Sequence, residues 1–281
     1  MNLRDALLQA RKRLEEAGCE SPDLDARVLL GHVTGYDHAR LIARDREELG
    51  DRASAFEALI RRREAREPVA YLTGRREFRS LDFEVGPGVL VPRPETELLV
   101  ERATAFLLER GAGANVVDVG TGSGVLAICI SRDFPAACTW AVDRSPAALE
   151  IACRNADRLR GGGPGILFLH SNLVDSFGPH TLDLVVSNPP YLSASDLAGA
   201  PPELSFEPRL ALEGGRDGLD VLRDLAHGAR RVLRPGGRLL VEIGPQQAGE
   251  VRKILLGSGF ARAGVLVDLE GRARVLEADS A

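Results

Sequence analysis

The stretch Asp118-Val119-Gly120-Thr121-Gly122-Ser123-Gly124 decides the fold of this chain, because it joins two different sequence patterns. A short apolar run at 116–119 leads into it, and a helical pattern at 125–131 follows it. Glycines let the backbone turn sharply and allow a ligand to approach the main chain near the start of a helix. The pattern predicts a strand, a glycine-rich loop and a helix, with a nucleotide-like ligand at the loop. A purely structural turn is the alternative.

Outward from this loop, short apolar runs alternate with helical patterns, which is typical of a parallel sheet with helices on both faces. The further runs lie at 139–142, 166–169, 182–186 and 239–243. The last two, 265–269 and 274–277, are separated by a segment too short for a crossover helix, so they predict an antiparallel hairpin. The expected fold class is α/β, with a doubly wound, mostly parallel sheet that ends in this hairpin.

The N-terminal part follows a different pattern. Leu3, Leu7, Ala10 and Leu14 recur at helical spacing, and Ser21-Pro22 is typical of an N-cap followed by the first helical residue. Further helical patterns lie at 38–44 and 51–66, and alternating apolar residues with Gly and Pro follow up to residue 94. We therefore expect a helical domain over 1–75, a hairpin-like linker over 76–94 and the sheet domain over 95–281.

Composition limits the class of protein. With 44% apolar and 27% charged residues, the 281-residue chain is typical of soluble globular proteins. Its net charge of −5 disfavours nucleic acid as the main partner, because proteins that bind phosphates tend to be basic. No apolar run reaches the roughly 18 residues of a membrane span, and the start of the chain predicts no signal peptide. Four cysteines without C-x-x-C spacing predict reduced thiols in a cytoplasm and no metal site.

The loop and the next strand narrow the choice of ligand. The glycine spacing is G-x-G-x-G, whereas the dinucleotide fingerprint requires a third glycine where this chain has Val125, which disfavours NAD. Asp143 ends the second apolar run, about twenty residues beyond the loop, where a carboxylate can accept hydrogen bonds from both hydroxyls of a ribose. An N-cap for a helix that begins near Ser145-Pro146 is the alternative role of Asp143.

The third apolar run closes with His170-Ser171-Asn172-Leu173. Asn172 could hydrogen-bond the edge of an adenine and Leu173 could cover its face. A lone Asn at the end of a strand is also typical of a turn, so both interpretations stay open.

The fourth run ends in Asn188-Pro189-Pro190-Tyr191, the most informative stretch of the chain. Two consecutive prolines donate no backbone hydrogen bond, so the carbonyls around them are free and rigidly held. The Asn188 side-chain oxygen and the Pro189 carbonyl could each accept one hydrogen of a planar NH₂ group, while Tyr191 packs against it. Because all four strand ends meet at one edge of a parallel sheet, we expect one site there.

Together these motifs resemble the class I S-adenosylmethionine-dependent methyltransferases that modify planar exocyclic or amide nitrogens. A narrower resemblance, to the release-factor glutamine methyltransferases, covers nearly the whole chain. Further segments carry it: 68–97, with Leu72-Thr73-Gly74, Arg76-Glu77-Phe78 and Val91-Pro92-Arg93-Pro94-Glu95-Thr96-Glu97, then Phe206-Glu207-Pro208, 214–218, Glu242-Ile243-Gly244 and 268–275.

This resemblance implies a seven-stranded sheet and a cofactor, S-adenosylmethionine, that leaves as S-adenosylhomocysteine. It implies that Gly120, Thr121, Gly122, Ser123 and Gly124 cradle the methionine part of the cofactor. Asp143 is then expected to bind the ribose, and Asn172 and Leu173 to flank the adenine. The family often has Asp and an aromatic residue at these last two positions.

The resemblance also implies a reaction and a partner. Asn188, Pro189, Pro190 and Tyr191 are expected to bind a glutamine side chain, with Asn188, Pro189 and Tyr191 as the catalytic set and Asn188 also near the cofactor. The target is the glutamine of the Gly-Gly-Gln motif in peptide chain release factors, in the cytoplasm, and the N-terminal helical domain is expected to help recognise them. Two alternatives stay open: a methyltransferase for an exocyclic amino group of RNA or DNA, and a non-catalytic protein that binds translation factors.

Overall fold

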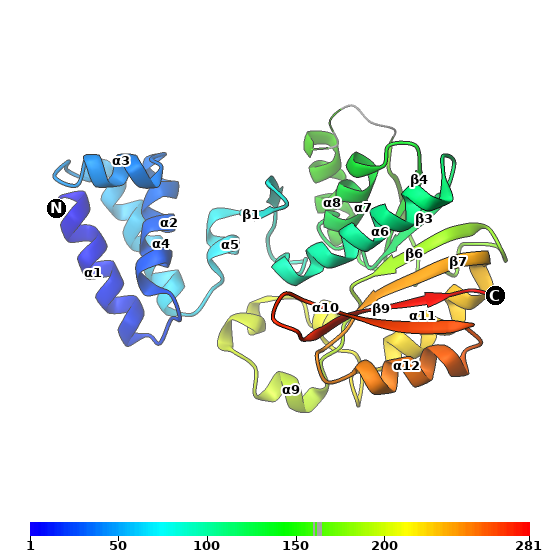
Figure 1. Ribbon diagram of the computed structural model, residues 1–281. Helices are drawn as coiled ribbons and strands as arrows, with labels where there is room; N and C mark the ends of the chain where they lie inside the picture. Colours follow the sequence, from blue (N-terminus) through cyan, green and yellow to red (C-terminus); the bar gives the residue numbers. More distant parts are fainter. Residues whose placement is uncertain (160, 162–164) are drawn as a thin grey trace. The chain divides into compact units, whose positions relative to one another are not determined.

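The computed structural model describes residues 1–159, 161 and 165–281, which form two compact units. The helical unit comprises Met1–Arg75 together with Pro201–Phe206. The sheet unit comprises Arg76–Ala200 and Glu207–Ala281. Residues 76–94 therefore belong to the sheet unit, and a short segment that lies between β6 and α10 in the sequence belongs to the helical unit (Figure 1).

The helical unit folds around the apolar stripe that the sequence predicts. Leu3, Ala10 and Leu14 are buried, and the side chain of Asn2 caps the first helix by accepting a hydrogen bond from the Asp5 amide at 2.8 Å. The second helix begins at Pro22 as expected, but the side chain of Ser21 makes no capping hydrogen bond. The elements of this unit are α1 (Leu3–Glu16), α2 (Pro22–Thr34), α3 (His38–Ala43), η1 (Gly50–Arg52), α4 (Ala53–Glu64), α5 (Val69–Thr73) and η3 (Pro202–Phe206).

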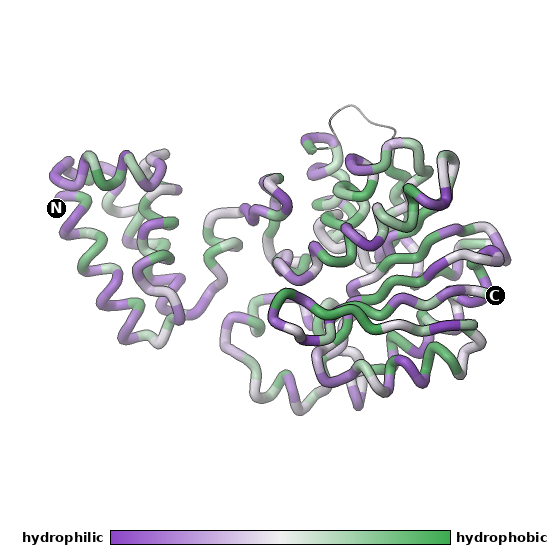
Figure 2. Tube along the Cα trace, viewed as in Figure 1, coloured by the Kyte–Doolittle hydropathy of each residue, from purple (hydrophilic) through white to green (hydrophobic). Residues whose placement is uncertain are grey.

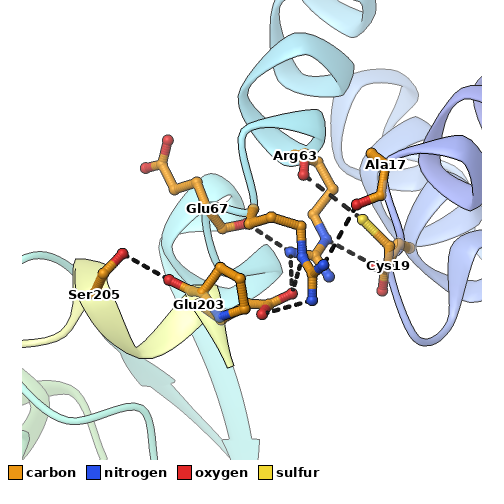
Figure 3. Close-up of polar contacts among 9 residues, drawn as sticks. Ala17, Cys19, Arg63, Glu67, Glu203 and Ser205 are labelled. Carbon is orange, nitrogen blue, oxygen red and sulfur yellow. Dashed lines mark hydrogen bonds and ion pairs between the residues drawn. The ribbon is translucent and has the colours of Figure 1, made fainter. Parts of the chain in front are cut away.

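Ion pairs hold the segment Pro201–Phe206 in the helical unit (Figure 3). The Glu203 carboxylate accepts hydrogen bonds from Arg63 at 3.0 Å and from Arg66 at 2.7 and 2.8 Å. The same Arg63 guanidinium, almost fully buried, donates to Asp25 at 2.8 Å. Burial raises the pKa of Glu203, but the hydrogen bonds from Arg66 and Arg63 outweigh it, so the pKa is lowered overall.

The sheet unit contains a seven-stranded sheet among its described residues, in the order β5-β4-β3-β6-β7-β9-β8. The pairs from β5 to β7 are parallel, and β9 pairs antiparallel with both β7 and β8. This confirms the doubly wound, mostly parallel sheet and the C-terminal hairpin. The strands are β3 (Asn115–Val119), β4 (Cys138–Asp143), β5 (Leu167–His170), β6 (Leu182–Ser187), β7 (Leu233–Glu242), β8 (Arg262–Val267) and β9 (Ala273–Asp279); β1 (Arg75–Phe78) and β2 (Leu81–Glu84) form a separate two-stranded sheet.

Helices cover both faces of the large sheet, whose strands are largely hydrophobic in Figure 2. Alternate strand residues face opposite layers, so Val116 packs in the core under α6 and α7 while Val117 packs in the core with α11 and α12. The helices of this unit are α6 (Glu97–Arg110), α7 (Val125–Asp133), α8 (Pro146–Leu159), α9 (Ala194–Ala198), α10 (Arg209–Leu212), α11 (Asp220–Val232) and α12 (Ala248–Gly257), with the short η2 (Pro94–Thr96). Among the described residues, no helix is long and apolar enough to cross a bilayer.

The strand order determines at which edge of the sheet a ligand is expected to bind. The chain turns from β3 to β4 on one side and returns to β6 on the other, which creates a crevice beyond the carboxyl ends of the strands. The register pairs Val119 with Val142 and with Ser187, so the residues that follow β3, β4 and β6 lie at one level.

Candidate active site

A cavity of about 220 Å³ lies at this edge of the sheet unit. The glycine loop after β3 lines it together with Asp143 at the end of β4, Asn172 and Leu173 after β5, and the segment 188–190 after β6. The residues that the sequence predicts at four separate strand ends therefore border one space. Residues from 88–96 and from 208–213 complete its wall.

The glycine loop has the backbone that only glycine adopts readily. Gly120, Gly122 and Gly124 have φ angles of 72°, 56° and 86°. A Cβ at Gly124 would lie 3.0 Å from the Ile128 side chain and 3.2 Å from that of Ala152, so the loop packs tightly against its own helices there. A Cβ at Gly120 would meet no atom within 4 Å, which leaves this part of the loop open toward a ligand.

Asp143 connects the glycine loop to the end of β4. One carboxylate oxygen accepts the Gly122 amide at 3.0 Å and the other accepts the Ser145 amide at 2.9 Å. The Ser145 hydroxyl accepts the Ala148 amide at 3.2 Å and thus caps α8, so Asp143 does not carry the cap. Each carboxylate oxygen has a second lone pair, which leaves acceptors for two hydroxyls of a ligand.

Asn172 combines turn chemistry with a place at the cavity. Its carbonyl accepts the Asp175 amide at 3.1 Å and its side-chain amide donates to Asp175 at 3.2 Å. Leu173 has a φ of 45° and packs its half-buried side chain against the core around β4 and α11. Among the described residues, the side-chain oxygen of Asn172 accepts no hydrogen bond, so it can accept one from the polar edge of a ligand.

Asn188, Pro189 and Pro190 border the cavity, whereas Tyr191 lies just behind them. The Tyr191 carbonyl accepts a hydrogen bond from Gln247 at 2.9 Å. Burial, and then the nearby Glu242, raise the pKa of the Tyr191 hydroxyl to about 12. Tyr191 is therefore neutral and held in place beside the cavity.

Comparison with known proteins gives full-length relatives. A family profile described as the PrmC N-terminal domain matches residues 5–74, and one described as the methyltransferase small domain matches residues 95–200. The release factor glutamine methyltransferase of Moorella thermoacetica is 43% identical over 98% of this chain and 97% of its own length. That of Burkholderia pseudomallei is 46% identical over 89% and 87%. This chain belongs to the release factor glutamine methyltransferase family.

The fold also matches that of a solved methyltransferase with low sequence identity. A methyltransferase from Pyrococcus furiosus superposes with a TM-score of 0.52 at 17% identity, over 80% of this chain and 98% of that one. At this identity, the match shows the shared fold alone.

Asp118 is a residue of this family member for which the sequence indicated no role. It is fully buried under the glycine loop, where one oxygen accepts the Thr121 hydroxyl at 2.6 Å and the Ala127 amide at 3.1 Å. Burial raises its pKa to about 7. These bonds join the end of β3 to the first turn of α7, so Asp118 holds the loop in its ligand-ready shape.

Two long-range partners support the segment at 188–191. The Asn188 side-chain amide donates to the Thr96 hydroxyl at 3.3 Å, and that hydroxyl donates to Glu242 at 2.7 Å. Thr96 and Glu242 entered the sequence analysis only within the motifs that carry the family resemblance. A usable signal existed for Glu242, because it is a carboxylate at the carboxyl end of a parallel strand next to β6.

Glu207 anchors residues 91–93, part of the segment 88–96 that lines the cavity. Its carboxylate is buried, accepts the Val91 amide at 2.9 Å and also forms a short ion pair with Arg93. Arg93 borders the cavity, whereas Glu207 does not, so Glu207 supports part of the cavity wall through Arg93. The described residues contain no group of three or more His, Cys, Asp or Glu side chains arranged to hold a metal ion.

Proposed function

We propose that this chain transfers a methyl group from S-adenosylmethionine to the side-chain amide nitrogen (N5) of the glutamine in the Gly-Gly-Gln motif of peptide chain release factors. One observation carries the proposal: the segment 188–190 borders the same cavity as the glycine loop and Asp143. A site for a planar amide and a site for the methyl donor therefore share one space. The full-length similarity to release factor glutamine methyltransferases supports the same substrate.

The residues of the cavity fit the cofactor. The open backbone at Gly120 suits the methionine part, and the Asp143 carboxylate suits the two ribose hydroxyls. Asn172 and Leu173 flank the position expected for the adenine, with a polar acceptor and an apolar side chain. When bound, S-adenosylmethionine supplies an electrophilic methyl group on a sulfonium, and S-adenosylhomocysteine is the product.

The chain acts mainly by positioning. A glutamine amide nitrogen is a weak nucleophile, because its lone pair is delocalised into the carbonyl. The Asn188 oxygen and the Pro189 carbonyl accept the two amide hydrogens, which aims the nitrogen and favours the positive charge that develops on it. Pro190 and Tyr191 keep this acceptor pair rigid. A strong general base is not needed, since the amide proton becomes acidic only as the new bond forms and is then released to solvent.

We further propose that residues 1–75 help to bind the release factor, and that the reaction takes place in the cytoplasm, where release factors work. The N-terminal family profile covers nearly all of these residues and supports a role specific to this family. In this unit, the guanidinium groups of Arg40, Arg44 and Arg52 lie 4.4 to 5.6 Å from the centre of the Tyr36 ring and form a basic, aromatic cluster.

The test offers purified protein and methyl-labelled cofactor to release factor, RNA and DNA in separate reactions. Label should enter the release factor, disappear when its Gly-Gly-Gln glutamine is replaced, and be absent from both nucleic acids. A segment such as 188–191 also fits the amino group of a base. Labelled RNA or DNA with unlabelled release factor would therefore replace this proposal by a nucleic-acid methyltransferase.

A further inference from the structure

We propose that Thr96 and Glu242 are positioning residues for methyl transfer, which fix the orientation of the Asn188 amide through a directed chain of hydrogen bonds. The inference rests on the proposed function, since it assigns Asn188 to the substrate amide. It concerns a pair of residues that lie 146 positions apart: Thr96, which borders the cavity, and Glu242, which does not.

The geometry brings three elements together. Asn188 follows β6 and Glu242 ends β7, and the register pairs their neighbours Ser187 and Val241. Thr96 ends η2, and its hydroxyl lies 3.3 Å from the Asn188 side-chain nitrogen and 2.7 Å from the Glu242 carboxylate, while the Asn188 side chain is itself close enough to act on Glu242. Thr96 and Glu242 are 2% and 1% exposed, so water does not compete for these bonds.

The number of available hydrogens determines which group donates and which accepts in each hydrogen bond between Asn188, Thr96 and Glu242. A threonine hydroxyl has one hydrogen, and an ionised carboxylate can only accept. The Thr96 hydrogen therefore points to Glu242, and the Thr96 oxygen can only accept a hydrogen from Asn188. The NH₂ end of the Asn188 amide must face Thr96, which turns its oxygen away from this contact. That is the orientation that an acceptor for the substrate NH₂ requires.

The charge of Glu242 strengthens this arrangement. Through the chain of hydrogen bonds, a carboxylate polarises the hydroxyl and then the amide, so the Asn188 oxygen becomes a better acceptor. Positive charge develops on the substrate nitrogen during methyl transfer, and a more negative oxygen beside it favours that charge. Protonated Glu242 would instead donate to Thr96 and remove the direction of the chain.

Glu242 has no ion-pair partner at hydrogen-bond distance within the described residues. The charged or titratable groups that act on it are Glu95, Arg274 and Tyr191, with Arg93 close to Tyr191. Burial, and to a lesser extent Glu95, raise the pKa of Glu242 to about 7, against the opposing hydrogen bond from Thr96, the charge of Arg274 and the side chain of Asn188. A buried carboxylate without a cation at hydrogen-bond distance costs folding stability, which indicates that its role lies in the site.

The main experiment compares Thr96→Val with a matched control, Thr139→Val. Thr139 is equally buried in β4, its hydroxyl has no partner among the described residues, and it does not border the cavity. Thr96→Val should lower kcat at least about tenfold while the KM for release factor and the Kd for cofactor change by less than about threefold. Thr139→Val should behave as wild type, and Thr96→Ser should restore most of the turnover because it keeps the hydroxyl.

A pH profile and a spectroscopic readout separate positioning from mere structural support. Wild-type kcat should rise with pH through about 7 as Glu242 ionises, and Glu242→Gln should lose this limb together with most of its turnover. In the protein without substrate, the side-chain NH₂ resonance of nitrogen-labelled Asn188, assigned with Asn188→Ala, should shift in Thr96→Val and Glu242→Gln and stay unchanged in Thr139→Val.

Each outcome decides the inference. It is overturned if Thr96→Val keeps wild-type turnover, if Thr139→Val loses as much, or if the Asn188 resonance does not respond. If wild-type protein methylates no release factor, the proposed function fails, but the resonance still tests the hydrogen-bond chain in the absence of substrate. Urea unfolding of each variant shows that the compared proteins are folded.

Discussion

Each unit contains a carboxylate that is partly or fully buried, and these two carboxylates, half-buried Glu203 and buried Glu242, are held in opposite ways. In the helical unit, Glu203 accepts hydrogen bonds from Arg63 and Arg66, which lower its pKa despite burial. In the sheet unit, Glu242 faces a hydroxyl and an amide, and burial raises its pKa to about 7. One charge is matched by guanidinium groups, whereas the other has only neutral partners at hydrogen-bond distance.

This difference separates a structural from a functional use of the same side chain. The Glu203 cluster fixes a short segment of the chain in a unit that is distant in sequence, so its loss should appear in stability. The hydrogen bonds from Glu242 lead to the side-chain amide of Asn188, which we assign to substrate binding, so loss of these bonds should lower turnover. The comparison would be refuted if disrupting the Glu203 cluster lowered turnover and disrupting the Glu242 hydrogen bonds lowered stability instead.

The largest effect is expected for Arg63→Met. This change leaves Asp25 without its guanidinium partner and deprives Glu203 of one of its two, so the helical unit should lose about 3–5 kcal/mol of unfolding free energy. Circular dichroism in urea should show that the helical unit of the variant unfolds at a lower urea concentration than that of the wild type. Fluorescence of Trp140, the single tryptophan, reports on the sheet unit and should change much less.

The control for Arg63 lies on the same helix. Arg61 forms an exposed pair with Glu57 at 3.5 Å, and its side chain is 68% exposed. Arg61→Met should therefore change the stability by no more than about 0.5 kcal/mol. Equal losses in the two variants would show that the buried cluster has no special role in stability.

The second effect concerns the reacting centre. Asn188→Ala should keep the fold and most of the cofactor affinity but lower turnover about a hundredfold or more, since a preorganised polar contact at the reacting atoms is lost. Steady-state kinetics with release factor measure this loss, and calorimetry measures cofactor binding. Asn188→Asp sharpens the result: partial activity would indicate that acceptance of hydrogen bonds suffices, and activity as low as that of Ala would indicate that the neutral amide is required.

A smaller effect is expected on the cofactor side. Asp143→Ala removes a charge-assisted pair of hydrogen bonds and should weaken S-adenosylmethionine binding at least about tenfold, with each such bond worth roughly 1.5 to 3 kcal/mol. Titration calorimetry with the cofactor or its demethylated product checks this. Because Asp143 also accepts the Gly122 and Ser145 amides, unfolding in urea must be compared in parallel. Strong binding of NAD by wild type, with no binding of either compound, would contradict the cofactor assignment.

Sequence patterns could predict those parts of the site that depend on local order. Glycines after a strand, an acidic residue at the next strand end and two prolines at a third each have a local physical reason, and parallel pairing brings them to one edge. The structure places Gly120, Asp143, Asn172 and Asn188 around one cavity accordingly. The fold class followed from the same alternation of strands and helices.

The supporting contacts were beyond such patterns, because they join residues that are far apart in sequence. Thr96 and Asn188 are 92 positions apart, and Arg63 and Glu203 are 140 positions apart. Nothing in the local sequence of Glu203 distinguishes it from a surface glutamate, and only the fold reveals its two arginines. Tyr191 does not border the cavity among the described residues, and the expected packing of its ring on the substrate group stays a prediction.

The smallest effect is a difference in the pH dependence of stability, and it tests the two carboxylates directly. Glu242 has a folded-state pKa raised from 4.5 to about 7, so the folded protein binds more protons than the unfolded chain and loses stability as the pH rises between these values. One such group contributes at most about 1.4 kcal/mol per pH unit. Asp118, whose pKa is also raised to about 7, adds to the same slope. Glu242→Gln should therefore make the unfolding free energy of the sheet unit depend less on pH between about pH 5 and 7, but only in part, as followed by Trp140 fluorescence in urea.

Glu203→Gln should act with the opposite sign in the helical unit, because a lowered pKa gives stability above the unfolded value of 4.5 that is lost as the pH falls. The same slope change in both variants would mean that the guanidinium partners do not distinguish the two sites.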